Sequence, residues 1–420
     1  MLLVVVALAA AVYCFWPKSI PRQHGALPQD VYVWQRKWTA GVKEAIAEHG
    51  TNFGELISLK AEVSWKRGEP EVVRVPVEYA LLKQSTTRAG LALRIGAYSG
   101  IFEREAASTR WLCELAKSMV SEARSNALPL AELQIDFDCP ESKLAGYAKW
   151  VSAIRAAVSP VPVTITALPA WLKRQSFKQL IKVVDGYVLQ VHSLERPRSA
   201  DAKFTLCDPA AARQAVERAA RLGKPFRVAL PTYGYVLAFD VNGRFAGVSA
   251  ENPAMTWPKG TQLRELSADP NALADLVKSW TENRPSALAG LIWYRLPIAE
   301  DTLNWRWATL AAVMNGATPR ADVLAQLSYP SAGLVEIALT NTGAASDAGP
   351  MQVTLSWQEA RLVACDALRD FDVSENGAST VHFKSKAGLL PLLPGENRMI
   401  GWMRLSTEAK VRYEIRHTER

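Results

Sequence analysis

The sequence is poor in cysteine and lacks the motifs that mark several common protein classes. Its 420 residues include five cysteines, which are far apart: Cys14, Cys113, Cys139, Cys207 and Cys365. This spacing excludes a disulfide framework and a zinc motif, and it leaves either one Cys139–Cys207 bridge or separate buried thiols. No His, Asp and Cys residues have metal-ligand spacing, so we expect neither a metal nor another cofactor.

Long runs of one charge are also missing. The net charge is +8, but the basic residues are scattered along the chain. Because nucleic-acid binding favours a clustered basic stripe, we expect no nucleic-acid partner. A mildly basic surface still favours anionic polymers.

The longest apolar run lies at the N-terminus, over residues 1–16, and Pro17, Lys18 and Arg22 follow it. A bilayer-spanning helix needs about 20 apolar residues, so this run is short for one. We expect residues 1–27 to be a signal peptide and linker, with a short membrane anchor as the alternative. Either one predicts an exported protein of the periplasm or cell envelope.

Eight β-rich apolar runs recur, and nearly all are separated by stretches with helical spacing. They are Val31–Trp34, Leu56–Trp65, Leu91–Tyr98, Leu133–Asp138, Val163–Leu168, Gly186–His192, Phe226–Tyr233 and Leu288–Leu296. This alternation predicts a fold of the α/β class, a (β/α)8 TIM barrel over residues 28–318. An open doubly wound sheet is the alternative, but no GxGxxG follows the first run.

Helices are expected near 39–48, 78–84, 105–124, 142–157, 172–183, 208–222, 270–283 and 303–314. Asn242-Gly243, between two apolar runs, predicts a β-hairpin after the seventh strand. Beyond Pro330 short alternating runs predict a small all-β sandwich domain over residues 328–420. That domain serves either structural support or accessory carbohydrate binding.

Polar residues share one parity along the expected strands, and side chains of one parity point to the same face. Inward-facing candidates are Ser58, Lys60, Glu62, Arg94, Gln134, Asp136, Asp138, Thr164, Thr166, Gln190, His192, Trp293 and Arg295. Because barrel active sites lie at the C-terminal ends of the strands, this pattern predicts a polar pocket there.

Three carboxylates, Asp136, Asp138 and Glu141, lie close together at the end of the fourth run. Hydrolysis of a glycosidic bond needs one protonated carboxyl group and a second group that supports positive charge. Repulsion between Asp136 and Asp138 would raise one pKa, which predicts Asp138 as general acid, with Asp136, Glu62 or Glu141 assisting. The alternative is that Asp138 or Cys139 caps the next helix.

The other candidates would position substrate. Arg94 either binds substrate or forms a structural ion pair with Asp136. Glu62 either assists catalysis or forms an ion pair with Lys60 or Arg94. His192 is either catalytic or a hydrogen-bonded residue of the pocket wall. Flat rings suit the apolar faces of sugars. The candidate substrate-binding residues are Trp34, Arg94, Tyr98, Gln190, His192, Tyr233, Trp293 and Arg295.

Several long segments carry a family resemblance. Tyr32-Val-Trp-Gln-Arg, Leu133-Gln-Ile-Asp-Phe-Asp-Cys-Pro-Glu, Val188-Leu-Gln-Val-His and Arg227-Val-Ala-Leu-Pro-Thr-Tyr-Gly-Tyr resemble the bacterial domain-of-unknown-function family 3142 over residues 28–315. The resemblance implies a barrel like those of glycoside hydrolases. More distantly, Asp136 and Asp138 are similar to the inner aspartates of the family 18 chitinase motif, whose acid position holds Pro140 here, with Glu141 one residue late.

These features predict a glycoside hydrolase-like protein that acts on an envelope or extracellular polysaccharide. Its partner would be a carbohydrate polymer or oligosaccharide. The alternative is a glycan-binding envelope protein without turnover, which the displaced Glu141 favours. A third, weaker alternative is a structural envelope protein without a ligand.

Overall fold

The computed structural model describes residues 20–85, 88–192, 199–201, 205–249, 256–368 and 370–417. The chain divides into two compact units, one of Met1–Asp269 with Lys278–Asn304 and one of Pro270–Val277 with Trp305–Arg420. The expected signal peptide or anchor lies outside the described residues. Within them, no helix has the length and apolarity that a bilayer crossing requires.

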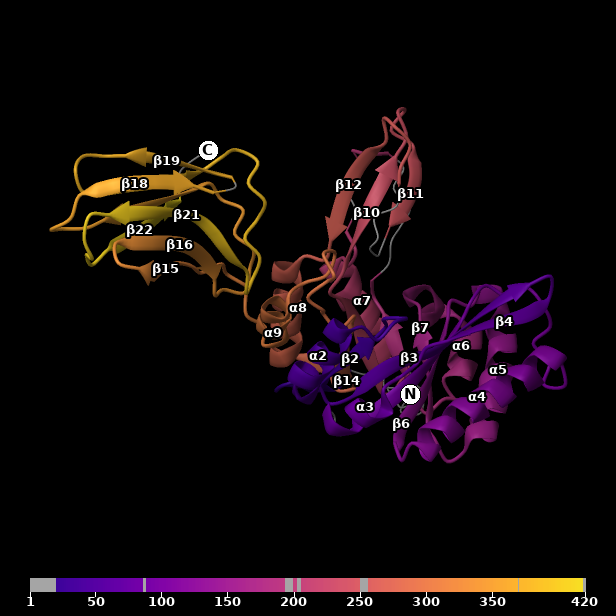
Figure 1. The fold of residues 1–420 in the computed structure, drawn as a ribbon. Coiled ribbons are helices and arrows are strands. Elements are labelled where there is room, and N and C mark those ends of the chain that lie inside the picture. Colours follow the sequence, from indigo (N-terminus) through magenta and orange to yellow (C-terminus); the bar gives the residue numbers. More distant parts are fainter. Residues whose placement is uncertain are drawn as a thin grey trace, which may run out of the picture. The chain divides into compact units, whose positions relative to one another are not determined.

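Eight parallel strands close into a barrel, which confirms the predicted fold class (Figure 1). In chain order they are β2 (Gln29–Val33), β3 (Leu56–Lys66), β5 (Ala89–Ile95), β6 (Leu130–Phe137), β7 (Val163–Ala167), β8 (Gly186–Gln190), β9 (Phe226–Pro231) and β14 (Leu288–Tyr294). Closure comes from β2, where Val31 pairs with both Trp293 and Leu56. The strands are apolar runs because parallel sheets are buried on both faces.

Helices follow most of these strands along the chain. They are α2 (Ala40–His49), α3 (Tyr79–Ser85), α4 (Ala107–Ser125), α5 (Leu144–Val158), α6 (Gln175–Leu180), α7 (Pro209–Ala220), α8 (Pro270–Glu282) and α9 (Trp307–Met314). Local signals set their starts: Asp208 accepts hydrogen bonds from the N–H groups of Ala210 and Ala211, and Pro209 occupies the first turn of α7. Figure 1 shows α4, α5 and α6 on the outside of the barrel strands.

The helix expected over 172–183 is shorter and divided. A 3-10 turn, η3 (Pro169–Lys173), comes first, and Arg174 then has extended dihedral angles before α6 begins. Trp171 and Phe177 are both buried on the two sides of this break. The apolar spacing that suggested one helix therefore belongs to two short turns.

Two β additions extend the barrel strands. After β3 the chain reverses at Arg67 and Gly68, both with positive φ, and β4 (Glu69–Arg74) pairs antiparallel with β3. After β9 a three-stranded sheet forms from β10 (Gly234–Phe239), β11 (Phe245–Ser249) and β12 (Gln262–Ser267). Asp240 supports its first turn, since its carboxylate accepts from the N–H groups of Asn242 and Arg244, and Gly243 has a φ of 72°.

The C-terminal strands form two four-stranded antiparallel sheets. One contains β15 (Val323–Ser331), β16 (Leu334–Asn341), β18 (Leu362–Ala367) and β21 (Asn397–Leu405), and the other β17 (Met351–Ser356), β19 (Phe371–Glu375), β20 (Thr380–Ser385) and β22 (Arg412–His417). Burial alternates along β16, as expected for a strand with one face in a core. The two sheets share one core that includes Ile337, Val353, Phe383 and Met403, so this part is a β-sandwich.

Cysteines in the described part of the chain are free thiols: Cys113, Cys139, Cys207 and Cys365. Of the two alternatives for Cys139 and Cys207, the structure has separate buried thiols. Burial raises the pKa of each thiol to about 12, so both are unreactive at neutral pH.

Candidate functional site

A hollow of about 300 Å³ opens at the C-terminal ends of the barrel strands. We call it the acidic hollow, and its lining residues are Tyr32, Trp34, Arg94, Asp136, Asp138, Thr166, Gln190, His192, Ala229, Tyr233, Tyr235 and Tyr294. They come from seven of the eight barrel strands or from the residues just after them, and from β10. Parallel strands bring their C-terminal ends to one rim, which is why residues distant in sequence meet here.

Asp136 lies in the wall of this hollow with its carboxyl group largely withdrawn from solvent. The hydroxyl of Thr166 on β7 donates to its Oδ1 at 2.8 Å, and Arg94 on β5 lies 3.9 Å from its Oδ2. Burial raises the pKa of Asp136 to about 6; Arg94 lowers this pKa, and Asp138 raises it. Asp136 therefore holds its proton at mildly acidic pH, at which an ordinary aspartate is charged.

Asp138 and Glu141 follow β6 and have different surroundings. Asp138 is exposed and lines the acidic hollow. It does not cap the next helix: the 3-10 turn η2 (Glu141–Lys143) precedes α5, and neither N-terminus has a side-chain cap. Glu141 forms an ion pair with Arg174 and does not line the hollow.

A second hollow of about 430 Å³ adjoins the first, and we call it the arginine hollow. It shares Trp34, Arg94, Tyr233, Tyr235 and Tyr294 with the acidic hollow and adds Arg36, Glu62, Val248, Ser249 and Arg295. Glu62 binds both arginines: Arg36 donates to it at 2.5 and 3.2 Å, and Arg94 lies 3.7 Å away.

Lys60 does not share the inward face with Glu62, contrary to the parity argument. The pairing of β3 with β5 shifts register between Leu59 and Ala61, so Lys60 occupies a bulge. Its ammonium group bonds Glu122 on α4 at 2.6 Å, on the helix side of the barrel. A bulge inserts one residue and thereby reverses the side-chain alternation beyond it.

Aromatic rings form one wall shared by both hollows. Tyr294 contacts Trp34, Tyr32 and Tyr233 edge to face, with ring centroids 5.5, 5.9 and 5.3 Å apart. Tyr235 packs on Tyr233 at 5.1 Å. Several aromatic surfaces beside carboxylates are typical of saccharide sites, because sugars present both C–H faces and hydroxyl edges.

His192 stands behind this aromatic wall as a neutral ring. It stacks on Tyr294 at 5.6 Å, and its Nδ1 lies 3.1 Å from the Tyr233 hydroxyl. Burial lowers the pKa of His192 to about 3, so the imidazole carries no charge near neutral pH. This environment suits a residue that positions the tyrosines.

Other sequence candidates lie differently. Trp293 is fully buried, with its indole N–H donating to Gln29 at 2.7 Å, and Tyr98 packs on Trp65 and Trp150 outside both hollows. Arg295 pairs with Asp301 at the wall of the arginine hollow. Residues that the sequence candidates omitted include Tyr32 and Arg36. Tyr32 lies within the expected strand Val31–Trp34 and shares the parity of Trp34, whereas Arg36 lies just after that strand.

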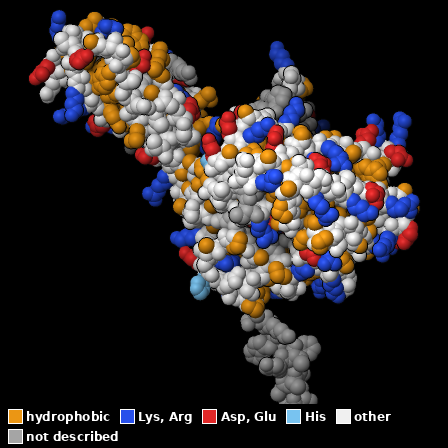
Figure 2. All heavy atoms as spheres, turned by 60° about the horizontal axis from the view of Figure 1, so that its bottom comes forward, with side chains coloured by type: hydrophobic (Ala, Val, Ile, Leu, Met, Phe, Trp, Pro, Cys, Tyr) orange, Lys and Arg blue, Asp and Glu red, His pale blue; other side chains and the backbone are white. Residues whose placement is uncertain are grey.

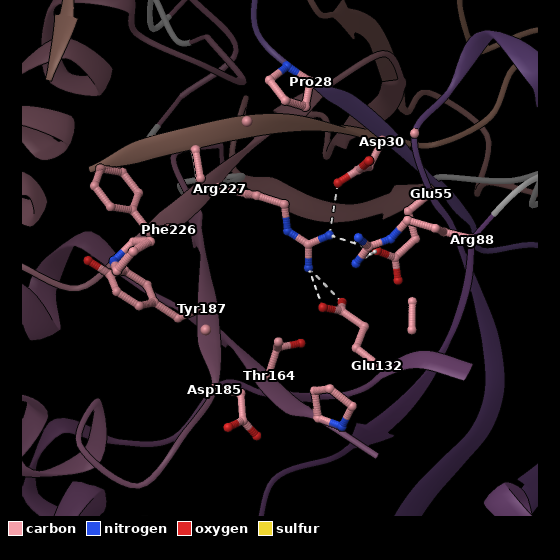
Figure 3. A pocket seen from close by; sticks show the side chains of 17 residues that line it. Pro28, Asp30, Glu55, Arg88, Glu132, Thr164, Asp185, Tyr187, Phe226 and Arg227 are labelled. Atoms are coloured by element: carbon pink, nitrogen blue, oxygen red, sulfur yellow. Dashed lines mark hydrogen bonds and ion pairs between the residues drawn. The ribbon is translucent and has the colours of Figure 1, made fainter. Parts of the chain in front are cut away.

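A third hollow, of about 480 Å³, lies at the opposite, N-terminal ends of the strands (Figure 3). The Arg227 guanidinium at its centre bonds Asp30 at 2.8 Å and Glu132 at 2.6 Å, and Glu55 lies 3.7 Å away. Burial, together with Glu132, raises the pKa of Glu55 to about 8. These groups tie β2, β6 and β9 together, which marks the cluster as structural.

Charged side chains are interspersed over the face shown in Figure 2, where Lys and Arg alternate with Asp and Glu. In the described residues, no group of three or more His, Cys, Asp or Glu side chains is arranged to hold a metal ion.

The chain is thus a (β/α)8-barrel protein with a carboxylate- and aromatic-lined rim, followed by a β-sandwich. Residues 105–299 match the model of the family described as "Domain of unknown function (DUF3142)", which confirms the family resemblance of the sequence. Residues 325–406 match a second family model, "Domain of unknown function (DUF8456)". No curated protein matches the chain in sequence.

Solved structures with a similar fold include three bacterial enzymes. The spore cortex-lytic enzyme SleL of Bacillus cereus has a TM-score of 0.48 and 12% identity, over 70% of this chain and 76% of that chain. A chitinase of Chromobacterium violaceum has a TM-score of 0.48 and 12% identity, over 69% of this chain and 99% of that chain. The chitinase ChiB of Flavobacterium johnsoniae has a TM-score of 0.46 and 13% identity, over 70% of this chain and 94% of that chain. Identities this low establish no shared activity.

Proposed function

We propose that this protein is a glycoside hydrolase-like enzyme that cleaves an envelope or extracellular polysaccharide at the acidic hollow. The observation that carries the proposal is the carboxyl group of Asp136, which is buried beneath an open, aromatic-lined rim and has its pKa raised to about 6. The apolar residues 1–16 support export to the compartment where such polymers occur.

In this proposal Asp136 and Asp138 act as a pair. Asp136 keeps one proton in the pair at mildly acidic pH, and Asp138, the exposed member, delivers it to the glycosidic oxygen. The C–O bond then breaks and its electrons pass to the protonated leaving oxygen. Water supplies the hydroxyl at the anomeric carbon, and its remaining proton returns to the carboxylate pair. Asp138 is thus the general acid, as expected from the sequence, and Asp136 is its proton source.

A second group must support the positive charge that develops on the sugar. Glu62 supplies a further carboxylate in the described residues, and it lines the adjoining arginine hollow. A substrate amide can serve the same purpose. Trp34, Tyr235 and Tyr294 would contact the ring faces of the bound saccharide.

The test is turnover of a polysaccharide panel, read as new reducing ends at pH 5–6. Wild type should cleave at least one member, and Asp138→Asn should lower kcat by about 10²–10⁴-fold, the usual contribution of general acid catalysis, while binding is retained. Asp275→Asn, an exposed residue of α8, is the matched control and should leave turnover unchanged. Full activity in Asp138→Asn would refute the assigned role.

A second candidate function is glycan binding without turnover. The ion pair of Glu141 with Arg174 favours it, because this carboxylate is held away from the hollow. Binding of a panel member by wild type, with no cleavage of any member, would select this function over the first.

A further inference from the structure

We infer that the saccharide bound at the rim carries a carboxylate, as a uronic acid does, and that Arg94 binds this group. The inference rests on the proposed function and adds the substrate class to it. In the arginine hollow, Arg36 donates hydrogen bonds to the carboxylate of Glu62, and the guanidinium of Arg94 lies 3.7 Å from the same carboxylate.

The Arg94 side chain is held more weakly than those of Arg227 and Arg155. Its guanidinium lies 3.7 Å from Glu62 and 3.9 Å from Asp136, and it makes no hydrogen bond to any residue that the structure describes. By contrast, Arg227 makes three hydrogen bonds to carboxylates, and Arg155 makes two to Asp185. The donors of Arg94 are therefore available to a ligand.

Position adds a second argument. The side chain of Arg94 is 45% exposed and that of Arg36 is 56% exposed. Arg94 lines both hollows, so an anion bound there lies directly beside Asp136 and Asp138. A guanidinium presents a planar fork that matches the two oxygens of a carboxylate, and such charge-assisted pairs are among the strongest hydrogen bonds in proteins.

Selectivity follows from the same geometry. A neutral sugar unit at this place offers Arg94 uncharged hydroxyl oxygens, whereas a uronate offers two charged oxygens that match the guanidinium fork. Bound carboxylate would also offset the charge of Arg94, which lowers the pKa of Asp136 in the empty site. Substrate binding would thereby help Asp136 to keep its proton.

The experiment compares pairs of ligands by calorimetry at low salt. Hexasaccharides of galacturonate, glucuronate and mannuronate are each titrated beside their carboxyl-reduced, neutral counterparts. Wild type should bind at least one uronate about 10-fold or more tightly than its neutral counterpart, and the difference should shrink as NaCl is raised. Arg94→Gln should abolish the difference, and Arg94→Lys, which keeps charge without the fork, should retain part of it.

Arg213→Gln on α7 removes the same charge from an exposed outer position and should behave as wild type. Thermal unfolding of each variant verifies that the fold is intact. Equal binding of uronates and neutral counterparts by wild type would overturn the inference and leave the proposed function standing. Failure of wild type to bind any of these hexasaccharides would also overturn the inference, and turnover of the polysaccharide panel tests the proposed function separately.

Discussion

The residue that best defines this protein's chemistry is Asp136, whose state depends on opposing neighbours. Burial and Asp138 favour its neutral form, whereas Arg94 and the Thr166 hydroxyl favour its charged form. The balance leaves its pKa at about 6, above the usual 3.8. Groups held near the working pH by such a balance are typical of sites of proton transfer.

The raised pKa of Asp136 predicts a pH-dependent cost to folding. Between pH 4 and 6 the folded chain keeps this proton while the unfolded chain loses it, so stability falls as pH rises through that window, by about 3 kcal/mol for a shift of about two pH units. Asp136→Asn cannot ionise and should gain stability relative to wild type across this window.

Urea unfolding of both proteins from pH 3.5 to 7.5 measures this difference. Asp275→Asn should follow wild type at every pH. A constant difference between Asp136→Asn and wild type over the whole range would contradict the raised pKa.

Prediction from sequence succeeded unevenly at this scale. Parity along the strands placed Asp136, Gln190 and Arg94 at the rim, because those residues lie on or at the end of regular strands. It did not apply to Tyr98, which follows the end of β5 at Ile95, since the alternation holds only within a strand. Lys60 fell on a bulge, which its sequence does not signal.

At the scale of elements, the strands are joined by different groups at their two ends. The C-terminal rim has the half-exposed, loosely paired Arg94, whereas the N-terminal ends are joined by Arg227 and its buried carboxylates Asp30 and Glu132 (Figure 3). This division follows the general behaviour of such barrels, with function at one end and stability at the other.

Loss of Arg227 should therefore destabilise the barrel strongly. Arg227→Met leaves buried carboxylates without their partner, and we expect a loss of about 3–5 kcal/mol in the free energy of unfolding. Arg155→Met breaks the more exposed pair with Asp185 and should cost about 1 kcal/mol or less. Denaturant unfolding compares the two, and similar losses would contradict the structural role of the Arg227 cluster.

The eight strands were predictable because buried parallel strands are short apolar runs between helical stretches, as Val163–Ala167 illustrates. The Arg227 cluster was not. Asp30, Glu55, Glu132 and Arg227 are distant in sequence, and only closure of the barrel brings them together. The break at Arg174 was also unpredictable, because buried residues on both sides preserve a helix-like spacing.

At the scale of the whole molecule, the β-sandwich has a hydrophobic core of its own. Val335, Ile337, Phe383 and Ile400 are buried in it, and its strands pair only with one another in the described part of the chain. A domain with its own core can fold alone. The boundary near residues 318–328 stays a proposal from the sequence.

Expression of residues Trp305–Arg420 as a fragment tests this independence. We expect β-type circular dichroism and one cooperative thermal transition, because the fragment contains both sheets. A fragment that lacks a cooperative transition would show that the sandwich needs the rest of the chain.

The central claim is that Asp136 and Asp138 hold the proton that cleaves a saccharide, and a pH profile of kcat/KM tests it most directly. For the substrate found in the panel, activity should fall as pH rises above about 6, because the pair then loses its proton. In Arg94→Gln the fall in activity should begin at a higher pH, because the guanidinium that lowers the pKa of Asp136 is gone. An activity that stays constant up to pH 8 in wild type would contradict the account.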